Sequence, residues 1–142
     1  MSQRTEIDPL AYIQERGLGA LADRMGIEMI EFTAEHAIAT MPVEGNTQPI
    51  GLLHGGAYVV LGETLGSMHA NLHAPEGFVG VGVDINATHT GSATVGVVRG
   101  VCTPIHLGRT LTVHELVISD EQERHHSTVR HTNGKRPRRQ PT

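Results

Sequence analysis

One carboxylate in this sequence occupies a position where an ionised acid is costly. Glu63 is the only acidic residue between Glu44 and Glu76, and it lies in a run from Ala57 to Met68 that is apolar on nearly every side. A helix that is apolar all round is normally buried. An ionised carboxylate in such surroundings destabilises the fold unless it is paired. The sequence therefore indicates either a buried glutamate that pairs with an arginine or a backbone group, or a carboxylate used in a reaction.

The helical period places other useful groups near this carboxylate. Gly56, Val60, Glu63 and Ser67 fall on one stripe, with Ser67 one turn beyond Glu63. Gly55 and Gly56 leave free backbone N–H groups at the positive end of the helix dipole, where a carbonyl oxygen that gains negative charge is stabilised. Eight residues of helix separate that end from Glu63 by about 12 Å, so backbone curvature or a second chain must close the gap. Close packing is the alternative role for the two glycines.

The remaining reactive residues form no complete catalytic or metal-binding set. His69 and His73 are four residues apart, which suits two metal ligands, but no third ligand lies near them, so no metal site is predicted. Cys102 lies in a strand-like run without an evident histidine partner, and no Gly-x-Ser-x-Gly motif is present. No cofactor is expected.

Size and composition exclude several classes of protein. A chain of 142 residues predicts one domain with a proper core. Only two tyrosines and two phenylalanines are present, too few for stacking on single-stranded nucleic acid. The single Cys102 fits a reducing compartment, and with no signal peptide evident a cytoplasmic location is expected. No apolar run is long enough to predict a membrane span.

The charge is uneven along the chain. Lys135, Arg136, Arg138 and Arg139 are four of the eleven basic residues, and the preceding 134 residues keep seven basic against fifteen acidic ones. This pattern predicts a folded acidic domain over residues 1–132 and a basic, disordered tail over residues 133–142. The tail could touch phosphate or nucleic acid, but a solvated terminus is the favoured interpretation, and no nucleic-acid partner is expected.

The hydrophobic pattern predicts an α+β fold. Asp8 and Pro9 suit the start of a short helix that ends by Gly17, and a second short helix is expected from Leu18 to Arg24. Strand-like patterns cover residues 27–32, 37–43, 79–89, 95–104 and 111–117, with a turn at 106–109. A last strand from Arg124 to Thr132 is so polar that we expect it to be frayed, altered or absent. An antiparallel sheet wrapped around the long apolar helix is the predicted architecture.

Four blocks in their order and spacing resemble the hotdog-fold thioesterases, in particular their PaaI-type branch. The blocks are residues 48–56, 61–63, 84–89 and 100–109, and the similarity runs from about Met25 to Asp120. The resemblance implies a hydrolase for an acyl or aroyl thioester of coenzyme A or of a carrier protein's pantetheine arm. It also implies dimerisation into a continuous sheet, a homotetramer built as a dimer of dimers, and a site shared between chains.

The resemblance also implies roles for individual residues. Glu63 matches the nucleophile or general base, the Gly55 backbone N–H and Gln48 match groups that polarise the thioester carbonyl, and His54 and Ser67 match neighbours of the reacting group. The matching positions along the bound substrate are Gly82, His89, Ser92, His106, Leu107, Gly108 and Arg109. For His106 and Arg109 a solvated turn is the alternative.

Three features leave other functions open. Related sequences carry a basic residue near Gly91 and an acid near Val95, and this chain has neither, which weakens the predicted grip on coenzyme A phosphates. The last strand is also unusually polar. A hydratase or dehydratase that uses Glu63 with His54 or His89 is one alternative, and a protein that binds acyl thioesters without catalysis is another.

Overall fold

The fold was analysed in a computed structural model, which describes residues 8–139. It contains three helices, α1 (Pro9–Arg16), α2 (Ala20–Met25) and α3 (Gly55–Leu72). The strands are β1 (Glu28–Phe32), β2 (Ala37–Pro42), β3 (Phe78–His89), β4 (Val97–Leu107), β5 (Leu111–Asp120) and β6 (His125–Pro137). Among the described residues, no helix is long and apolar enough to cross a membrane.

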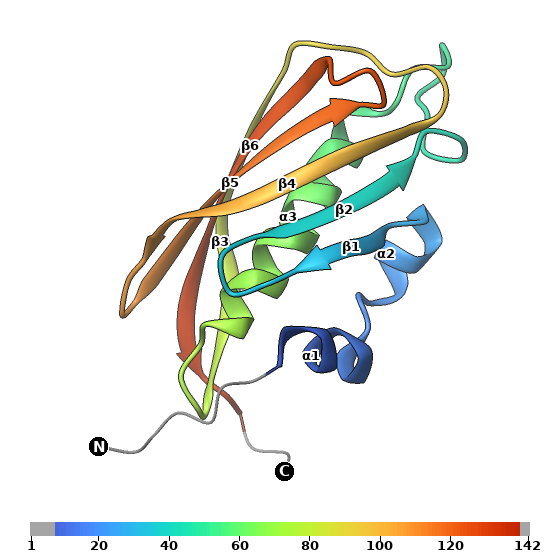
Figure 1. The fold of residues 1–142 in the computed structure, drawn as a ribbon. Helices are drawn as coiled ribbons and strands as arrows, with labels where there is room; N and C mark the ends of the chain where they lie inside the picture. Colours follow the sequence, from blue (N-terminus) through green and yellow to red (C-terminus); the bar gives the residue numbers. More distant parts are fainter. Residues whose placement is uncertain (1–7, 140–142) are drawn as a thin grey trace.

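The six strands form one antiparallel sheet that curves around α3, as Figure 1 shows. The strand order is β1-β2-β4-β5-β6-β3, so β1 and β3 are the edges. One face of α3 lies against the sheet, where Leu61 and Leu65 are fully buried. The predicted architecture, a sheet wrapped around one long helix, is confirmed.

Glycines in α3 allow β6 to approach the helix closely. A Cβ on Gly62 would lie 2.8 Å from the Val129 side chain, and one on Gly66 would lie within 3.2 Å of three His131 atoms. Glycine inside a helix costs about 1 kcal/mol relative to alanine, and the close packing offsets that cost. This contact brings the C-terminal strand against the helix that carries Glu63.

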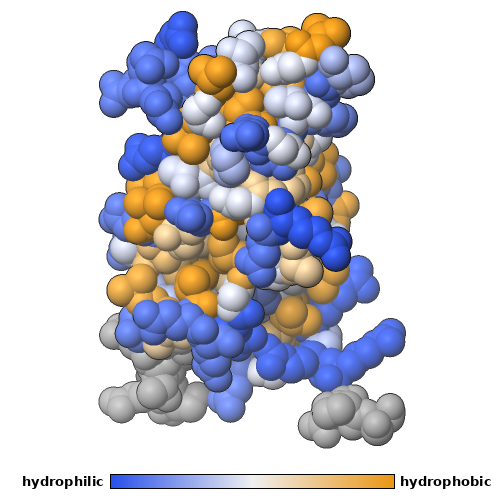
Figure 2. Space-filling model, turned by 90° about the vertical axis from the view of Figure 1, so that its right-hand side faces the viewer, coloured by the Kyte–Doolittle hydropathy of each residue, from blue (hydrophilic) through white to orange (hydrophobic). Residues whose placement is uncertain are grey.

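Both predicted N-terminal helices are present, although α2 begins at Ala20 rather than at the predicted Leu18. The Asp8 side chain accepts a hydrogen bond from the Leu10 N–H and caps α1, which stops at Gly17. Gly26, in the left-handed region, ends α2. Figure 2 views the side of the molecule on which these helices and β1 lie, and apolar residues appear there in several places between polar ones. The exposed leucines Leu10 and Leu21 belong to these helices.

The prediction for the C-terminal strand and tail is wrong over much of its length. β6 lies between β5 and β3 and is hydrogen-bonded to both, and residues 133–137 belong to it rather than to a disordered tail. Pairing on two sides overrides the low strand propensity of its polar residues. Lys135, predicted in the tail, donates from Nζ to the Gly108 carbonyl at 2.7 Å. The end of the predicted tail, residues 140–142, lies outside the described residues.

A second correction concerns the end of β4. Pro104 was expected to stop this strand because it lacks an N–H. Instead the pairing with β5 is irregular between Pro104 and His106 and then resumes to Leu107. His106 and Leu107 are therefore strand residues, and the turn begins at Gly108.

Candidate functional site

The first turn of α3 is organised around its own cap. His54 is the N-cap, and its Nδ1 accepts a hydrogen bond from the Gly56 N–H at 2.8 Å. The Ala57 N–H donates to the His54 carbonyl at 2.8 Å. No partner for the Gly55 N–H is found among the described residues. The positive end of the helix therefore presents one unused donor, as a developing oxyanion requires.

His89, at the end of β3, lies against Gly55. A Cβ on Gly55 would lie 3.1 Å from the His89 Nε2. The His89 Nδ1 is 2.8 Å from the Ser127 Oγ, and that hydroxyl is also placed to donate to the Thr88 carbonyl at 3.3 Å. Because the hydroxyl proton serves the carbonyl, the Ser127 oxygen accepts from Nδ1–H and the Nε2 lone pair faces Gly55. The structure thus brings His54, Gly55 and His89 together at the start of α3.

Gln48 lies in the tight turn that leads into α3. Its side-chain Oε1 accepts a hydrogen bond from the Ile50 N–H at 2.6 Å, and its backbone N–H donates to the Leu52 carbonyl at 2.8 Å. The loop is tied to the helix because the His54 N–H donates to the Asn46 carbonyl at 2.9 Å. The carboxamide oxygen is therefore occupied, and its NH2 group has no partner among the residues described. Such an amide can donate to a substrate carbonyl.

Glu63 and Ser67 line a pocket on the side of α3 that faces away from the sheet. The pocket has a volume of about 260 Å³ and is walled by Leu18, Leu21, Val60, Glu63, Thr64, Ser67 and Met68. The predicted stripe of Val60, Glu63 and Ser67 is thus found on one wall. A carboxylate and a hydroxyl in an otherwise largely apolar pocket resemble a small-molecule site.

The predicted burial of Glu63 is wrong within a single chain. Its side chain is 50% exposed: the sheet covers the opposite face of α3, and Glu63 lies at the margin of the exposed stripe, next to β3 and β6. The alternative of an arginine partner is also wrong, since no ion pair between Glu63 and an arginine occurs in the described part of the chain. The nearest titratable partner is His131, whose Nε2 lies 3.7 Å from Glu63 Oε1. Gly82 of β3 also lies at this carboxylate, because a Cβ there would be 2.9 Å from Oε1.

His131 is the residue near Glu63 that the sequence analysis missed. It lies on β6, which looked too polar to form a reliable strand. Every second residue of β6, namely Ser127, Val129, His131 and Asn133, is fully buried. This period of two is the sequence signal that could have placed His131 on the inward face of a strand. Polar side chains at inward positions are unusual, because burying them costs free energy unless they form hydrogen bonds.

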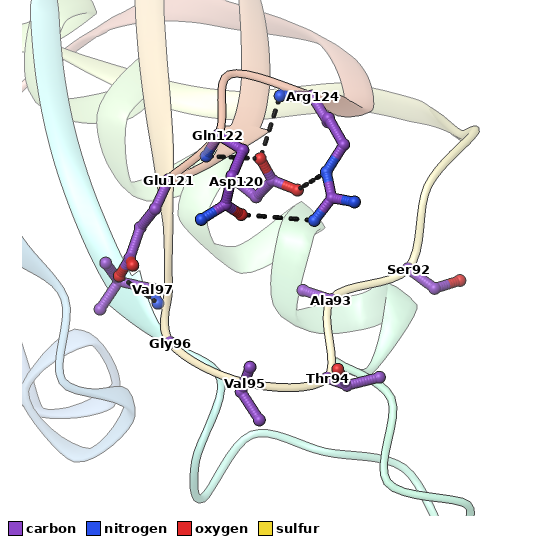
Figure 3. Close-up of a pocket in the computed structure, with 10 residues that line it drawn as sticks. All are labelled: Ser92, Ala93, Thr94, Val95, Gly96, Val97, Asp120, Glu121, Gln122 and Arg124. Carbon is purple, nitrogen blue, oxygen red and sulfur yellow. Dashed lines mark hydrogen bonds and ion pairs between the residues drawn. The ribbon is translucent and has the colours of Figure 1, made fainter.

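Ser92 belongs to a segment that arches over the β5–β6 turn, shown in Figure 3. The two enclose a cavity of about 110 Å³ lined by residues 92–97, Asp120, Glu121, Gln122 and Arg124. Glu121 Oε1 accepts from the Val97 N–H at 3.1 Å and so ties the arch to the turn. Ser92 itself is exposed and lies at the rim of the arch.

Asp120 anchors the turn beneath this arch. It accepts hydrogen bonds from His126 Nε2 at 3.0 Å, from Arg124 Nε at 2.8 Å, and from the backbone N–H groups of Gln122 and Arg124. The His126 hydrogen bond, with smaller contributions from Arg124 and Gln122, holds the pKa of this carboxyl well below its usual range. The Tyr58 hydroxyl bonds to the other His126 nitrogen at 2.8 Å and links the turn to α3. The network fixes the β5–β6 turn against α3.

Residues His106, Leu107, Gly108 and Arg109 are not brought to the rest of the site. They lie at the β4–β5 turn, at the opposite end of the sheet from the first turn of α3 (Figure 1). His106, Leu107 and Arg109 are exposed. Within one chain these four residues are therefore separate from the other predicted site residues.

No group of three or more potential metal ligands occurs among the described residues. His69 is instead a buried structural residue, with Nδ1 2.8 Å from His114 Nε2 and Nε2 3.0 Å from the Thr33 carbonyl. Burial lowers the pKa of His69 to about 4 and that of His114 to about 3, so both are neutral near pH 7.

Comparisons with known proteins agree on one family. The Thioesterase superfamily model matches residues 50–125. Proofreading thioesterase EntH of Cronobacter turicensis is 45% identical over 122 residues, covering 85% of this chain and 89% of the relative. Putative esterase ComA2 of Bacillus subtilis is 47% identical over 106 residues, covering 73% and 84%.

Solved structures give the same result. Thioesterase HI1161 from Haemophilus influenzae superposes with a TM-score of 0.84 at 34% identity, covering 96% of each chain. A mutant of thioesterase PA1618 from Pseudomonas aeruginosa gives a TM-score of 0.86 at 34% identity, covering 95% of this chain and 98% of that one. The PaaI protein of Escherichia coli, at 19% identity and a TM-score of 0.78, shares the fold.

Proposed function

Because the chain belongs to the thioesterase superfamily and has its hotdog fold, we propose that it hydrolyses aryl or medium-chain acyl thioesters of coenzyme A or of a carrier protein's pantetheine arm. The observation that carries this proposal is the position of Glu63 in the wall of an apolar pocket, beside Ser67. The pocket takes the acyl group, and the carboxylate meets the carbonyl carbon.

The spacing between Gln48 and Glu63 supports their assignment as a pair. Thioesterase SAV0944 from Staphylococcus aureus has been solved as a glutamine-to-alanine and as a glutamate-to-alanine variant, at 31% and 29% identity to this chain. The two replaced residues are fifteen positions apart, the same separation as between Gln48 and Glu63. We assign Gln48 to the carbonyl oxygen and Glu63 to the carbonyl carbon.

The reaction needs one carboxylate and one oxyanion site. The Gly55 N–H and the Gln48 NH2 donate to the thioester oxygen, and Glu63 takes a proton from a water that attacks the carbon. The tetrahedral intermediate then collapses, the C–S bond breaks, and the thiolate leaves with the proton held by Glu63. Direct attack by Glu63, followed by hydrolysis of the resulting anhydride, gives the same acid and thiol.

Two chains complete the site in this proposal. Within one chain Glu63 lies two helical turns from Gly55, about 12 Å along the axis. Strand β3 is an edge of the sheet and exposes Val81 and Val83, so a second copy can pair there and extend the sheet. The α3 of the partner then faces the first α3, and Glu63 of one chain meets Gly55 of the other. The assembly is a dimer of dimers.

A thiol-release assay over benzoyl, octanoyl and acetyl thioesters of coenzyme A and of pantetheine tests this function. We expect release of free thiol with aryl or medium acyl groups and slower release with acetyl. Binding of these thioesters without release of thiol over hours would instead indicate a non-catalytic binder. Hydration of an enoyl thioester with its C–S bond intact would indicate the hydratase alternative.

A further inference from the structure

His131 is a fully buried histidine whose ring meets the Glu63 carboxylate. Its side chain is 1% exposed, yet Nε2 lies 3.7 Å from Glu63 Oε1. Nε2 is buried and has no hydrogen-bond partner among the described residues. A buried polar atom without a partner is costly, and the Glu63 carboxylate lies close enough to become its acceptor.

The contacts on the other side of the ring place the proton on the nitrogen that faces Glu63. Asn133 Nδ2 lies 3.3 Å from the His131 Nδ1. With the carboxamide in this orientation its NH2 donates to Nδ1, which places the ring proton on Nε2. This assignment turns an N–H group toward Glu63.

Gly82 leaves the space between the two side chains open. A Cβ at position 82 would lie 2.9 Å from Glu63 Oε1 and 3.0 Å from His131 Nε2. A side chain at position 82 would therefore contact both groups. Glu63 is half exposed, so a rotation of its side chain can shorten the 3.7 Å separation to a hydrogen bond when substrate fills the pocket.

The charges around His131 favour a neutral donor. Burial lowers its pKa, and the carboxylates of Glu63 on α3 and Asp84 on β3 act in the opposite direction. His114, its register partner on β5, is itself neutral near pH 7 because burial lowers its pKa to about 3. No ion pair between Glu63 and a lysine or arginine occurs in the described part of the chain, so the ionised carboxylate depends on this N–H once an acyl group excludes water.

We propose that His131 is a positioning residue that donates its Nε2–H to Glu63, keeps the carboxylate ionised under a bound acyl group and fixes its orientation toward the thioester carbon. This inference rests on the proposed role of Glu63. It makes β6 part of the catalytic apparatus, where a purely structural strand needs only apolar residues that fill the space under α3.

The test is the pH dependence of kcat/KM for thiol release between pH 5 and 9. His131→Leu removes the N–H, so the ionised carboxylate becomes less stable, and we expect the midpoint of the acid limb to move up by about 1 pH unit. The rate should fall by up to about 10-fold at pH values below the wild-type midpoint and recover toward pH 9. His131→Gln can present an amide N–H near the same place and should restore the wild-type limb.

A matched control is His114→Leu, an equally buried histidine on the neighbouring strand that does not contact Glu63. Its acid limb should stay at the wild-type position. A wild-type acid limb in a folded His131→Leu would overturn the inference. If that variant does not fold, Gly82→Ala on the edge strand separates the same two groups from the outside, and an unmoved limb there would overturn it equally.

Failure of this inference differs from failure of the proposed function. If Glu63→Gln keeps the wild-type rate, Glu63 is not catalytic and the proposed function fails. If Glu63→Gln is inactive while His131→Leu keeps the wild-type pH profile, only the role of His131 is lost.

Discussion

The first turn of α3 and its middle hold their polar groups differently. At the start, His54 caps Gly56, Gln48 is fixed by Ile50, and His89 is fixed by Ser127. Each of these groups is ordered by short hydrogen bonds. In the middle, the carboxylate of Glu63 is half exposed and its partner His131 has an unpaired nitrogen.

This difference indicates which half of the site is ready in one chain. The oxyanion end is preorganised by its own loop, so it needs no reorganisation when charge develops. In our proposal, the carboxylate end gains its surroundings only when substrate and a second chain cover it. Substitutions at the two places should therefore have different effects on activity and on stability.

The largest effect should come from Glu63→Ala. Loss of the proposed nucleophile or base should lower kcat/KM by a factor on the order of 10⁴, as measured for single members of other catalytic sets. Because the side chain is half exposed, the midpoint of urea unfolding and the oligomeric state should stay at wild-type values. Undiminished thiol release would remove Glu63 from the mechanism.

A smaller loss is expected from Gln48→Ala. Removal of one donor to the oxyanion should reduce kcat by about 10- to 1000-fold with little change in KM. Steady-state kinetics on the same thioester measure both constants. A rise in KM alone would assign Gln48 to substrate binding and leave the oxyanion to Gly55.

Acid should destabilise the middle of the molecule through its buried histidines. In the unfolded chain these side chains have a pKa of about 6.5, and in the folded chain burial lowers it to about 4 for His69 and about 3 for His114. Between those values the unfolded state binds more protons, so stability is complete above about pH 6.5 and is lost as the pH falls. Urea unfolding from pH 8 to pH 4.5 should show this loss.

The matched control for that measurement is His69→Gln/His114→Gln, which removes both titrating rings. Its unfolding free energy should vary less with pH than that of the wild type. An equally steep dependence in this variant would show that other groups, not the buried pair, bind the extra protons.

The smallest effects are expected from two glycine substitutions in α3, one of which should change stability and the other the rate. Gly62→Ala places a Cβ 2.8 Å from the Val129 side chain and should cost about 1–3 kcal/mol of unfolding free energy by overpacking. Gly55→Ala meets only the His89 ring edge and should instead lower kcat. Denaturation and kinetics on both variants would sharpen the contrast, and equal stability losses would contradict it.

Much of this fold follows from local patterns. Asp8 with Pro9, the glycines at 17 and 26, and the alternation along β3 each predict an element that the structure contains. β6 could not be predicted in full, because its order comes from pairing with strands on both sides rather than from its polar residues. For the same reason, the sequence alone could not predict that Lys135 and His131 are ordered residues of this strand.

The candidate site divides in the same way. Helical spacing correctly placed Val60, Glu63 and Ser67 on one stripe. It could not show that this stripe faces away from the sheet, since an apolar helix gives no indication of which side the strands cover. Nor could it show that His106 and Arg109 lie at the far end of the sheet from Gly55, because that separation is set by strand register.

The central claim, a carboxylate from one chain acting on a carbonyl held by its partner, is tested most directly by mixing two defective variants. Glu63→Ala and Gln48→Ala are combined in equal amounts, allowed to exchange subunits and assayed for thiol release. If the site is shared, each mixed dimer contains one intact site, and the mixture should recover roughly a quarter of the wild-type rate. A rate no higher than the average of the two separate variants, with subunit exchange verified, would contradict the account.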